Sequence, residues 1–223
     1  MRQAHVLAIL LAAAPLLAAC DMFRSFESVC EKRLAPTAVH VVAKPVSYKY
    51  DFTQPTGALT SRGAHRAGTV VLGLVETEIR SEASVGLNGI RQFFGGRYCM
   101  RANLTVKLAF EPMTLFIANE QPEGSCAFRV TMEHELKHIA VYQDFLERFG
   151  TRVQEDLGRA LGDGIVYLGS KSDADAHVRA VLEKTLTPYM QGVQDELRAA
   201  QARVDSPAEY ARLDRHQAWC AGR

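Results

Sequence analysis

The chain has 223 residues, with 26 basic and 25 acidic side chains and a formal net charge of +1. This balance, without any basic block, excludes the charge pattern of a nucleic-acid-binding protein. The length suits one domain, and 48% hydrophobic residues are enough to build its core.

The first twenty residues have the pattern of a bacterial export signal. Met1–His5 is basic through Arg2, and the apolar stretch Val6–Ala19 is shorter than the roughly 20 residues of a membrane span. Leu17-Ala18-Ala19-Cys20 resembles the lipobox of bacterial lipoproteins, whose cysteine is lipidated and becomes the new N-terminus. The alternative is an ordinary signal peptide followed by an incidental cysteine. We expect a lipid anchor on Cys20 and a place in the bacterial cell envelope, facing the periplasm or the exterior.

These features divide the chain into three parts. Residues 1–19 are expected to be a lipoprotein signal peptide and residues 20–35 a lipidated tether. Residues 36–223 are expected to form a single domain with a C-terminal helical part.

The first half of this domain has strand patterns. Apolar and polar residues alternate in Val46–Phe52 and Leu104–Phe110, and Thr69–Ile79 is β-branched and apolar. Pro112 is expected to end one strand, and Met113–Ala118 to form the next. The stretch of residues 84–96 contains four glycines and is expected to be a short helix or a loop.

The second half is helical in pattern. Phe128–Phe149 lacks Gly and Pro, Gly150 is expected to end or bend this helix, and apolar residues recur at helical spacing between Val178 and Val204. Ser206-Pro207-Ala208-Glu209 has the pattern of a capping box that opens a last helix. The sequence predicts an α+β fold, with an antiparallel or mixed sheet followed by long C-terminal helices.

Four cysteines remain besides Cys20, and an even number in an exported protein favours disulfides. We expect the pairs Cys99–Cys126 and Cys30–Cys220. The first pair would bracket two predicted strands, and the second would join the ends of the domain. A cysteine-rich metal site is the alternative, but the chain has no C-x-x-C motif.

The helical stretch contains an H-E-x-x-H motif, His134-Glu135-Leu136-Lys137-His138. Residues four apart share one face of a helix, so the two imidazoles can bind one zinc ion. Glu135 can then accept a proton from a zinc-bound water, whose pKa the metal lowers to near 7, as this water attacks a carbonyl. The alternative is a chance arrangement on a charged helix, but the face of the histidines continues in Val141 and Phe145, as expected of a buried face.

The stretch from Cys126 to Phe145, with Gly-Ser-Cys leading into the motif, resembles predicted secreted zinc-dependent proteases of bacteria, of the zincin type. The resemblance implies a zincin-like fold, metal ligation by His134 and His138, and a general-base role for Glu135. In zincins, a sheet precedes the motif helix, and its edge strand holds extended substrate backbone.

A third metal ligand does not follow from the motif. The metzincin continuation is absent, because Val141 and Asp144 stand where that pattern has Gly and His. A chain reversal at Gly150 would bring Asp163 level with the two histidines. The candidates, in order, are Asp163, His177, Glu155 and Asp144.

The sequence thus predicts an envelope-anchored zinc-dependent hydrolase, a peptidase acting on polypeptides or on the peptides of peptidoglycan. Two alternatives are a non-catalytic lipoprotein with a structural zinc and a pseudo-enzyme that binds envelope components through its cleft. Glu135 favours catalysis over a structural zinc, because a structural site is closed by four ligands and needs no general base.

Overall fold

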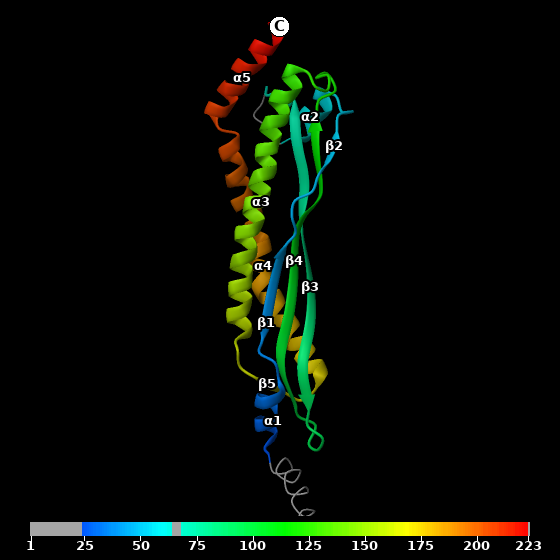
Figure 1. The fold of residues 1–223 in the computed structure, drawn as a ribbon, viewed down its shortest axis with the longest axis vertical. Coiled ribbons are helices and arrows are strands. Elements are labelled where there is room, and N and C mark those ends of the chain that lie inside the picture. The colour runs from blue at the N-terminus through cyan, green and yellow to red at the C-terminus, as the bar shows by residue number, and fades with distance from the viewer. Residues whose placement is uncertain (1–23, 64–67, 223) are drawn as a thin grey trace, which may run out of the picture.

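The computed structural model describes residues 24–63 and 68–222. The predicted signal peptide and the expected lipidation site, Cys20, lie outside these residues. The molecule is elongated, with long helices packed along a long, twisted sheet (Figure 1). Among the described helices, none has an apolar stretch long enough to cross a membrane.

The sheet is built around one long central strand, β4 (Tyr98–Ile117). β3 (Gly73–Arg91) pairs antiparallel with β4 over its whole length and therefore occupies one edge of β4. Three shorter strands share the other edge: β5 (Val166–Leu168), antiparallel, and β1 (Ala38–Ala43) and β2 (Lys49–Asp51), both parallel. The sheet is therefore mixed, and the predicted α+β fold is confirmed.

Two predictions about these strands are wrong. Residues 84–91 belong to β3 instead of forming a short helix or a loop. Pro112 does not end a strand, because it lies in an irregularity opposite Thr77 and Ile79, where the register shifts and β4 continues. Proline is tolerated there because a bulge needs no ladder hydrogen bond from that residue. The shift also moves the inward side chains from even positions, ending at Phe110, to odd positions, starting at Met113.

Three helices follow the sheet in the chain. They are α3 (Cys126–Leu161), α4 (Lys171–Val204) and α5 (Pro207–Ala221). Ser125 caps α3 by accepting a hydrogen bond from the amide of Phe128, and the predicted cap at Ser206 opens α5 in the same way. Gly150 neither ends nor bends α3 into two helices; the helix ends instead at Gly162, whose φ of 63° favours glycine.

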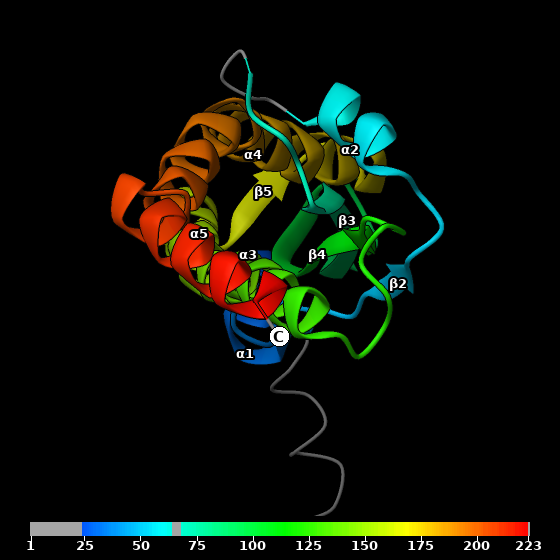
Figure 2. The same ribbon diagram turned by 90° about the horizontal axis from the view of Figure 1, so that it is seen from above.

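The main core lies between β4 and α3, and α4 completes it. The alternating inward side chains of β4, from Leu104 to Ile117, pack against one stripe of α3 that includes Phe145, Phe149 and Val153. In the view along the long axis, α5 lies on one side of the molecule, and β2 and the short α2 (Thr56–Arg62) on the other (Figure 2). α3 and α4 thus each bury one face and expose the other.

The four cysteines form two disulfides, as predicted, but the predicted pairing is wrong. The bonds join Cys30 to Cys99 and Cys126 to Cys220, instead of Cys99 to Cys126 and Cys30 to Cys220. Cys99 lies near one end of β4 and Cys126 follows its other end, so the long strand itself holds these two residues apart.

The first disulfide also fixes a helix in the segment expected to be a tether. α1 (Phe26–Arg33) buries Phe26 and Cys30 against the domain. The packed part of the chain therefore begins by Phe26, ahead of the predicted boundary at residue 36.

Candidate metal centre

The H-E-x-x-H motif lies in the first half of α3. His134 and Glu135 are 6% and 4% exposed, and Thr131, one turn earlier, is buried as well. His138 is one helical turn after His134, and the two rings meet with Nε2 atoms 3.2 Å apart. The helix therefore presents both predicted histidines to one point beneath the surface.

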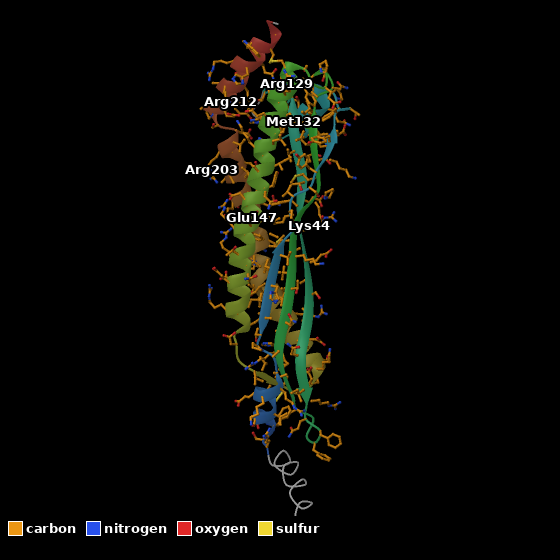
Figure 3. The ribbon with its side chains drawn as sticks, in the orientation of Figure 1. Lys44, Arg129, Met132, Glu147, Arg203 and Arg212 are labelled. Atoms are coloured by element: carbon orange, nitrogen blue, oxygen red, sulfur yellow. A yellow bond between two sulfur atoms is a disulfide. The ribbon has the colours of Figure 1, made fainter. Side chains whose placement is uncertain are left out.

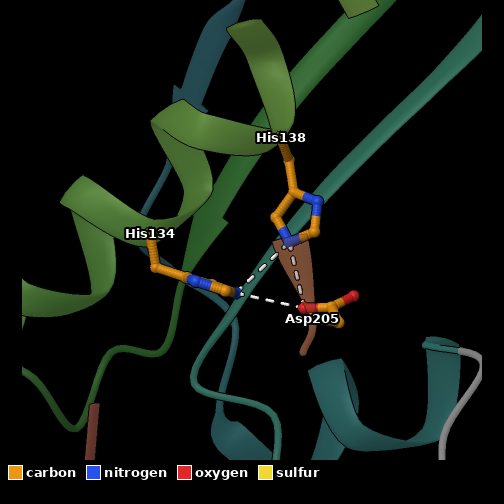
Figure 4. Close-up of side chains that lie close together, drawn as sticks. All are labelled: His134, His138 and Asp205. Carbon is orange, nitrogen blue, oxygen red and sulfur yellow. Dashed lines mark hydrogen bonds and ion pairs between the residues drawn. The ribbon is translucent and has the colours of Figure 1, made fainter. Parts of the chain in front are cut away.

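The third group at this point is Asp205, which ends α4. Its Oδ1 lies 3.3 Å from Nε2 of His134 and 3.2 Å from Nε2 of His138. The three side chains converge from two different segments of the chain (Figure 4). With these ligand atoms all within 4.8 Å of one another, the group could hold a metal ion.

Each histidine has a polar partner on its other ring nitrogen. Nδ1 of His138 lies 2.6 Å from Oε1 of Gln201, and the amide nitrogen of Gln201 donates to the backbone oxygen of His138 at 3.3 Å. Nδ1 of His134 lies 3.4 Å from Oε1 of Glu209. A proton on Nδ1, donated to this oxygen partner, would leave the lone pair of each Nε2 free to bind a metal ion at the shared point.

Ion pairs hold α5, and with it Glu209, against α3. Lys137 and Arg212 both bind Oε1 of Glu209, at 2.7 and 2.8 Å, and Arg212 also approaches Glu133 of α3. These bonds, from Arg212 first, hold the pKa of Glu209 well below its usual range. Figure 3 shows Arg212 and Arg129 at the same end of the molecule, whereas Lys44 and Glu147 lie midway along it. The candidate metal centre is thus located toward one end of an elongated structure.

The far end of α5 is fixed by the second disulfide. Cys220 is bonded to Cys126, the first residue of α3, and Gln217 donates to Oγ1 of Thr131 at 3.2 Å. α5 has no fully buried residue of its own, so this covalent bond and the polar contacts hold it in place. The segment from Asp205 to Glu209 is consequently held at both ends.

Glu135 lies beside the three-residue group in a confined space. Burial raises the pKa of its carboxyl to about 7, against the opposing effect of His138 and His134. Gly73, the first residue of β3, lies against it: a Cβ atom there would be 2.5 Å from Oε1 of Glu135 and 2.7 Å from Cγ2 of Thr131. Only glycine lets β3 approach the carboxylate this closely.

His138 and Asp205, which lie 3.2 Å apart at the centre, have pKa values shifted in opposite directions. Burial opposes the charge on His138, but the Asp205 carboxylate, with Glu135 and Gln201, outweighs burial and raises the pKa of His138. Burial also opposes the charge on Asp205, yet hydrogen bonds from His134 and His138 prevail and lower the pKa of Asp205 well below its usual range. Asp205 is therefore an anion that faces two imidazoles, as a carboxylate ligand should be.

None of the four predicted third ligands joins this group. Asp163, His177, Glu155 and Asp144 are all exposed, and Asp144 is paired with Arg148 on the outer surface of α3. The prediction of Asp163 assumed a chain reversal at Gly150, but α3 continues to Leu161. The chain therefore reverses after Leu161 and not at Gly150. As a result, the C-terminal end of α4 lies beside the histidines, and its N-terminal end lies far from them.

A signal for the missed residues is present in the sequence. Gln201, Asp205 and Glu209 follow one another at intervals of four, the spacing of neighbours on a helix face. Their polar atoms all reach the motif histidines. Asp205 also immediately precedes the capping box at Ser206, so it stands at a predicted break between two helices, where a side chain is free to turn inward.

Comparison of the chain with known protein families, with curated proteins and with solved structures finds no match.

Proposed function

We propose that this protein is a zinc-dependent hydrolase, a peptidase held in the bacterial cell envelope, with His134, His138 and Asp205 as zinc ligands. The observation that carries the proposal is the triangle of ligand atoms. Its sides of 3.2, 3.3 and 3.2 Å are nearly equal. Atoms bound at about 2.0–2.1 Å to a tetrahedral zinc lie about 3.3 Å apart, so the three donors fit this ion.

The number of ligands supports a catalytic site. A structural zinc is closed by four protein ligands, whereas a catalytic one keeps three and an open position. Within the described residues, the group contains two histidines and one carboxylate. When bound, zinc supplies a Lewis acid that polarises a carbonyl and lowers the pKa of a coordinated water.

Glu135 has the properties of a general base at this site. Its carboxyl lies next to the group yet is not one of the three ligands, and its burial, which raises its pKa, favours the uptake of a proton. Glu135 takes the proton of the attacking water and later passes it to the leaving amine. Because Gly73 has no side chain, the space beside it is open to the Glu135 carboxylate.

β3 offers a place for a peptide substrate. Within the described residues β3 pairs only with β4, so its outer edge is unpaired, and it begins at Gly73 beside Glu135. An extended peptide that adds to this edge would bring its backbone carbonyls past the metal centre. This arrangement favours polypeptides, or the peptides of peptidoglycan, as substrates.

The two disulfides support an extracytoplasmic location, because such bonds persist in oxidising compartments. The lipobox-like sequence ending at Cys20 supplies the proposed anchor. Fatty-acid labelling of the wild-type chain, and its loss in Cys20→Ser, tests this part of the proposal independently of the metal.

The central experiment separates ligation from catalysis. In His138→Ala, bound zinc should be lost together with hydrolysis of a broad peptide library. In Glu135→Gln, zinc should be retained while hydrolysis falls by about 10²–10⁴-fold, the usual contribution of a general base. His177→Ala, which changes an exposed histidine, should match the wild type in both measurements.

Two outcomes would redirect the proposal. Full zinc occupancy in His138→Ala would reject the metal centre. If zinc is bound, the wild type cleaves nothing and Glu135→Gln behaves as the wild type, the zinc is structural or the cleft only binds its ligand.

A further inference from the structure

The end of the molecule opposite the metal centre has an exposed aromatic pair. Phe93 and Phe94, in the loop between β3 and β4, are 91% and 80% exposed and pack edge to face on each other. Two adjacent phenylalanines exposed to water contribute nothing to the core. Such an exposed apolar patch is typical of a surface that binds a partner or a membrane. Gly95 and Gly96, both with positive φ, turn the chain back into β4 directly after them.

The part of the hairpin nearest this pair is basic. Between Glu82 and Glu111 the chain has no acidic residue, but it has three arginines and one lysine. Arg91 and Arg97 flank the loop and are exposed; Arg97 binds Glu27 of α1 at 2.7 Å and lies over the ring of Phe26. Aromatic side chains beside basic ones match the apolar interior and anionic surface of a bilayer.

The start of the described chain lies at the same end. α1 and the β3–β4 loop are adjacent at this end of the molecule (Figure 1), and the Cys30–Cys99 disulfide bonds α1 to β4 two residues beyond Arg97. Cys20 precedes Phe26 by six residues, which span at most about 20 Å. The proposed lipid anchor on Cys20 would therefore hold this loop close to the bilayer.

We infer that Phe93 and Phe94 insert into the lipid bilayer and form a second membrane contact beside the N-terminal anchor. This inference rests on the anchoring part of the proposed function, not on the metal chemistry. Two contacts hold the molecule upright, because one flexible tether alone would leave its orientation free. β3 extends over 19 residues from Arg91 to Gly73, which touches Glu135, so the metal centre stands about 60 Å from the lipid surface at 3.3 Å per residue.

The test uses the full chain reconstituted in vesicles of phosphatidylcholine and phosphatidylglycerol. Trp219 is the only tryptophan and lies in α5, at the metal end. In a Trp219→Phe background, Phe94→Trp reports on the loop, and Ser81→Trp, at an exposed position partway along β3, is the matched control. Phosphatidylcholine with brominated acyl chains quenches only tryptophans that reach the acyl region.

Phe94→Trp should emit at shorter wavelength in vesicles and lose about half or more of its emission to brominated lipid. Trp219 of the wild type and Ser81→Trp should be unaffected. Adding Phe93→Ser to Phe94→Trp should reduce the quenching. An unshifted, unquenched Phe94→Trp in vesicle-bound protein would overturn the insertion while leaving the anchor intact. A blue shift without quenching would also overturn it, since a protein would then cover the loop.

Discussion

Two segments of α3 have the same secondary structure and opposite interiors. From Phe145 to Leu157 the helix buries only apolar side chains and one glycine against β1 and β4. From Thr131 to His138 it buries a threonine, a histidine and a glutamate. These are three of the four buried polar residues among those described, the other being Gln121.

The difference shows where the fold buries polar groups at a cost in stability. An apolar side chain at Glu135 would avoid the cost of burying a carboxyl. The polar segment is also held from outside, by ion pairs and a disulfide to α5. The buried face of the apolar segment is held by packing, and polar contacts to α4 and β1 come only from side chains outside that face, such as Arg152 and Gln154. If the polar segment binds a metal ion as proposed, substitutions there should affect metal binding, and substitutions in the apolar segment should affect stability.

The largest effect is expected in the apolar segment. Phe149 is 1% exposed, and Phe149→Ala should lower the free energy of unfolding by about 3–5 kcal/mol, because it removes a large core side chain and leaves a cavity. Denaturant unfolding measures the loss. Zinc binding by the folded protein should be unchanged. Phe93→Ala, which truncates an exposed phenylalanine, is the control with little effect; an equal loss in both would contradict the assignment of this core.

A substitution at the metal centre beside the polar segment should reduce metal binding and leave the packing of the core intact. Asp205→Ala removes one of three ligands and should weaken zinc binding by more than about 100-fold, since even groups behind the ligands contribute 10–100-fold. Zinc titration against a chelator of known affinity measures it. Asp163→Ala should bind zinc like the wild type. Weaker zinc binding in Asp163→Ala, with normal binding in Asp205→Ala, would show that Asp163 is the third ligand and Asp205 is not.

The charges buried in the polar segment predict opposite pH dependences for the two metal states. Glu135, with its pKa raised from 4.5 to about 7, and His138, with a raised pKa, both bind protons more tightly in the folded than in the unfolded chain. The metal-free protein should therefore lose stability as pH rises from 5.5 to 7.5, by about 1–2 kcal/mol. Zinc needs deprotonated ligands, so its stabilisation should grow over the same range.

Thermal melting of metal-free and zinc-loaded protein at both pH values measures these slopes. Glu135→Gln should flatten the slope of the metal-free protein, because it removes one of the two titrating groups. A metal-free protein that gains stability between pH 5.5 and 7.5 would show that Glu135 is not buried as described.

The smallest effect concerns the two disulfides. Replacing Cys126 and Cys220 by serine frees one end of α5 and should weaken zinc binding by roughly tenfold, the scale of groups that only position the ligands. Replacing Cys30 and Cys99 changes the opposite end and should leave zinc affinity unaltered. The same titration compares both double variants. Equal affinities in the two would mean that the ion pairs of Glu209 suffice to hold Asp205.

Local pattern was enough to predict much of the site and part of the fold. The helix, its inward face and the meeting of His134 with His138 all follow from residues within a few turns of one another. The same holds for the cap at Ser206, which depends on four consecutive residues. The length of the β3–β4 hairpin does not follow from local pattern. Glycines at 86 and 89 and Pro112 weaken the strand pattern, and pairing between the two strands along the whole hairpin compensates for this.

The sequence by itself determined the two histidines, the neighbouring carboxylate and the presence of two disulfides, because each depends on residue type and short spacing. Only the tertiary structure decided which carboxylate joins the two histidines and how the cysteines pair. Asp205 follows His138 by 67 residues. It reaches the centre because α3 continues to Leu161 and α4 is long enough for its C-terminal end to return to the level of His138. Likewise, the length of β4 decides which cysteines can touch. Both outcomes depend on where long elements end, and a boundary displaced by a few residues brings a different side chain to the same point.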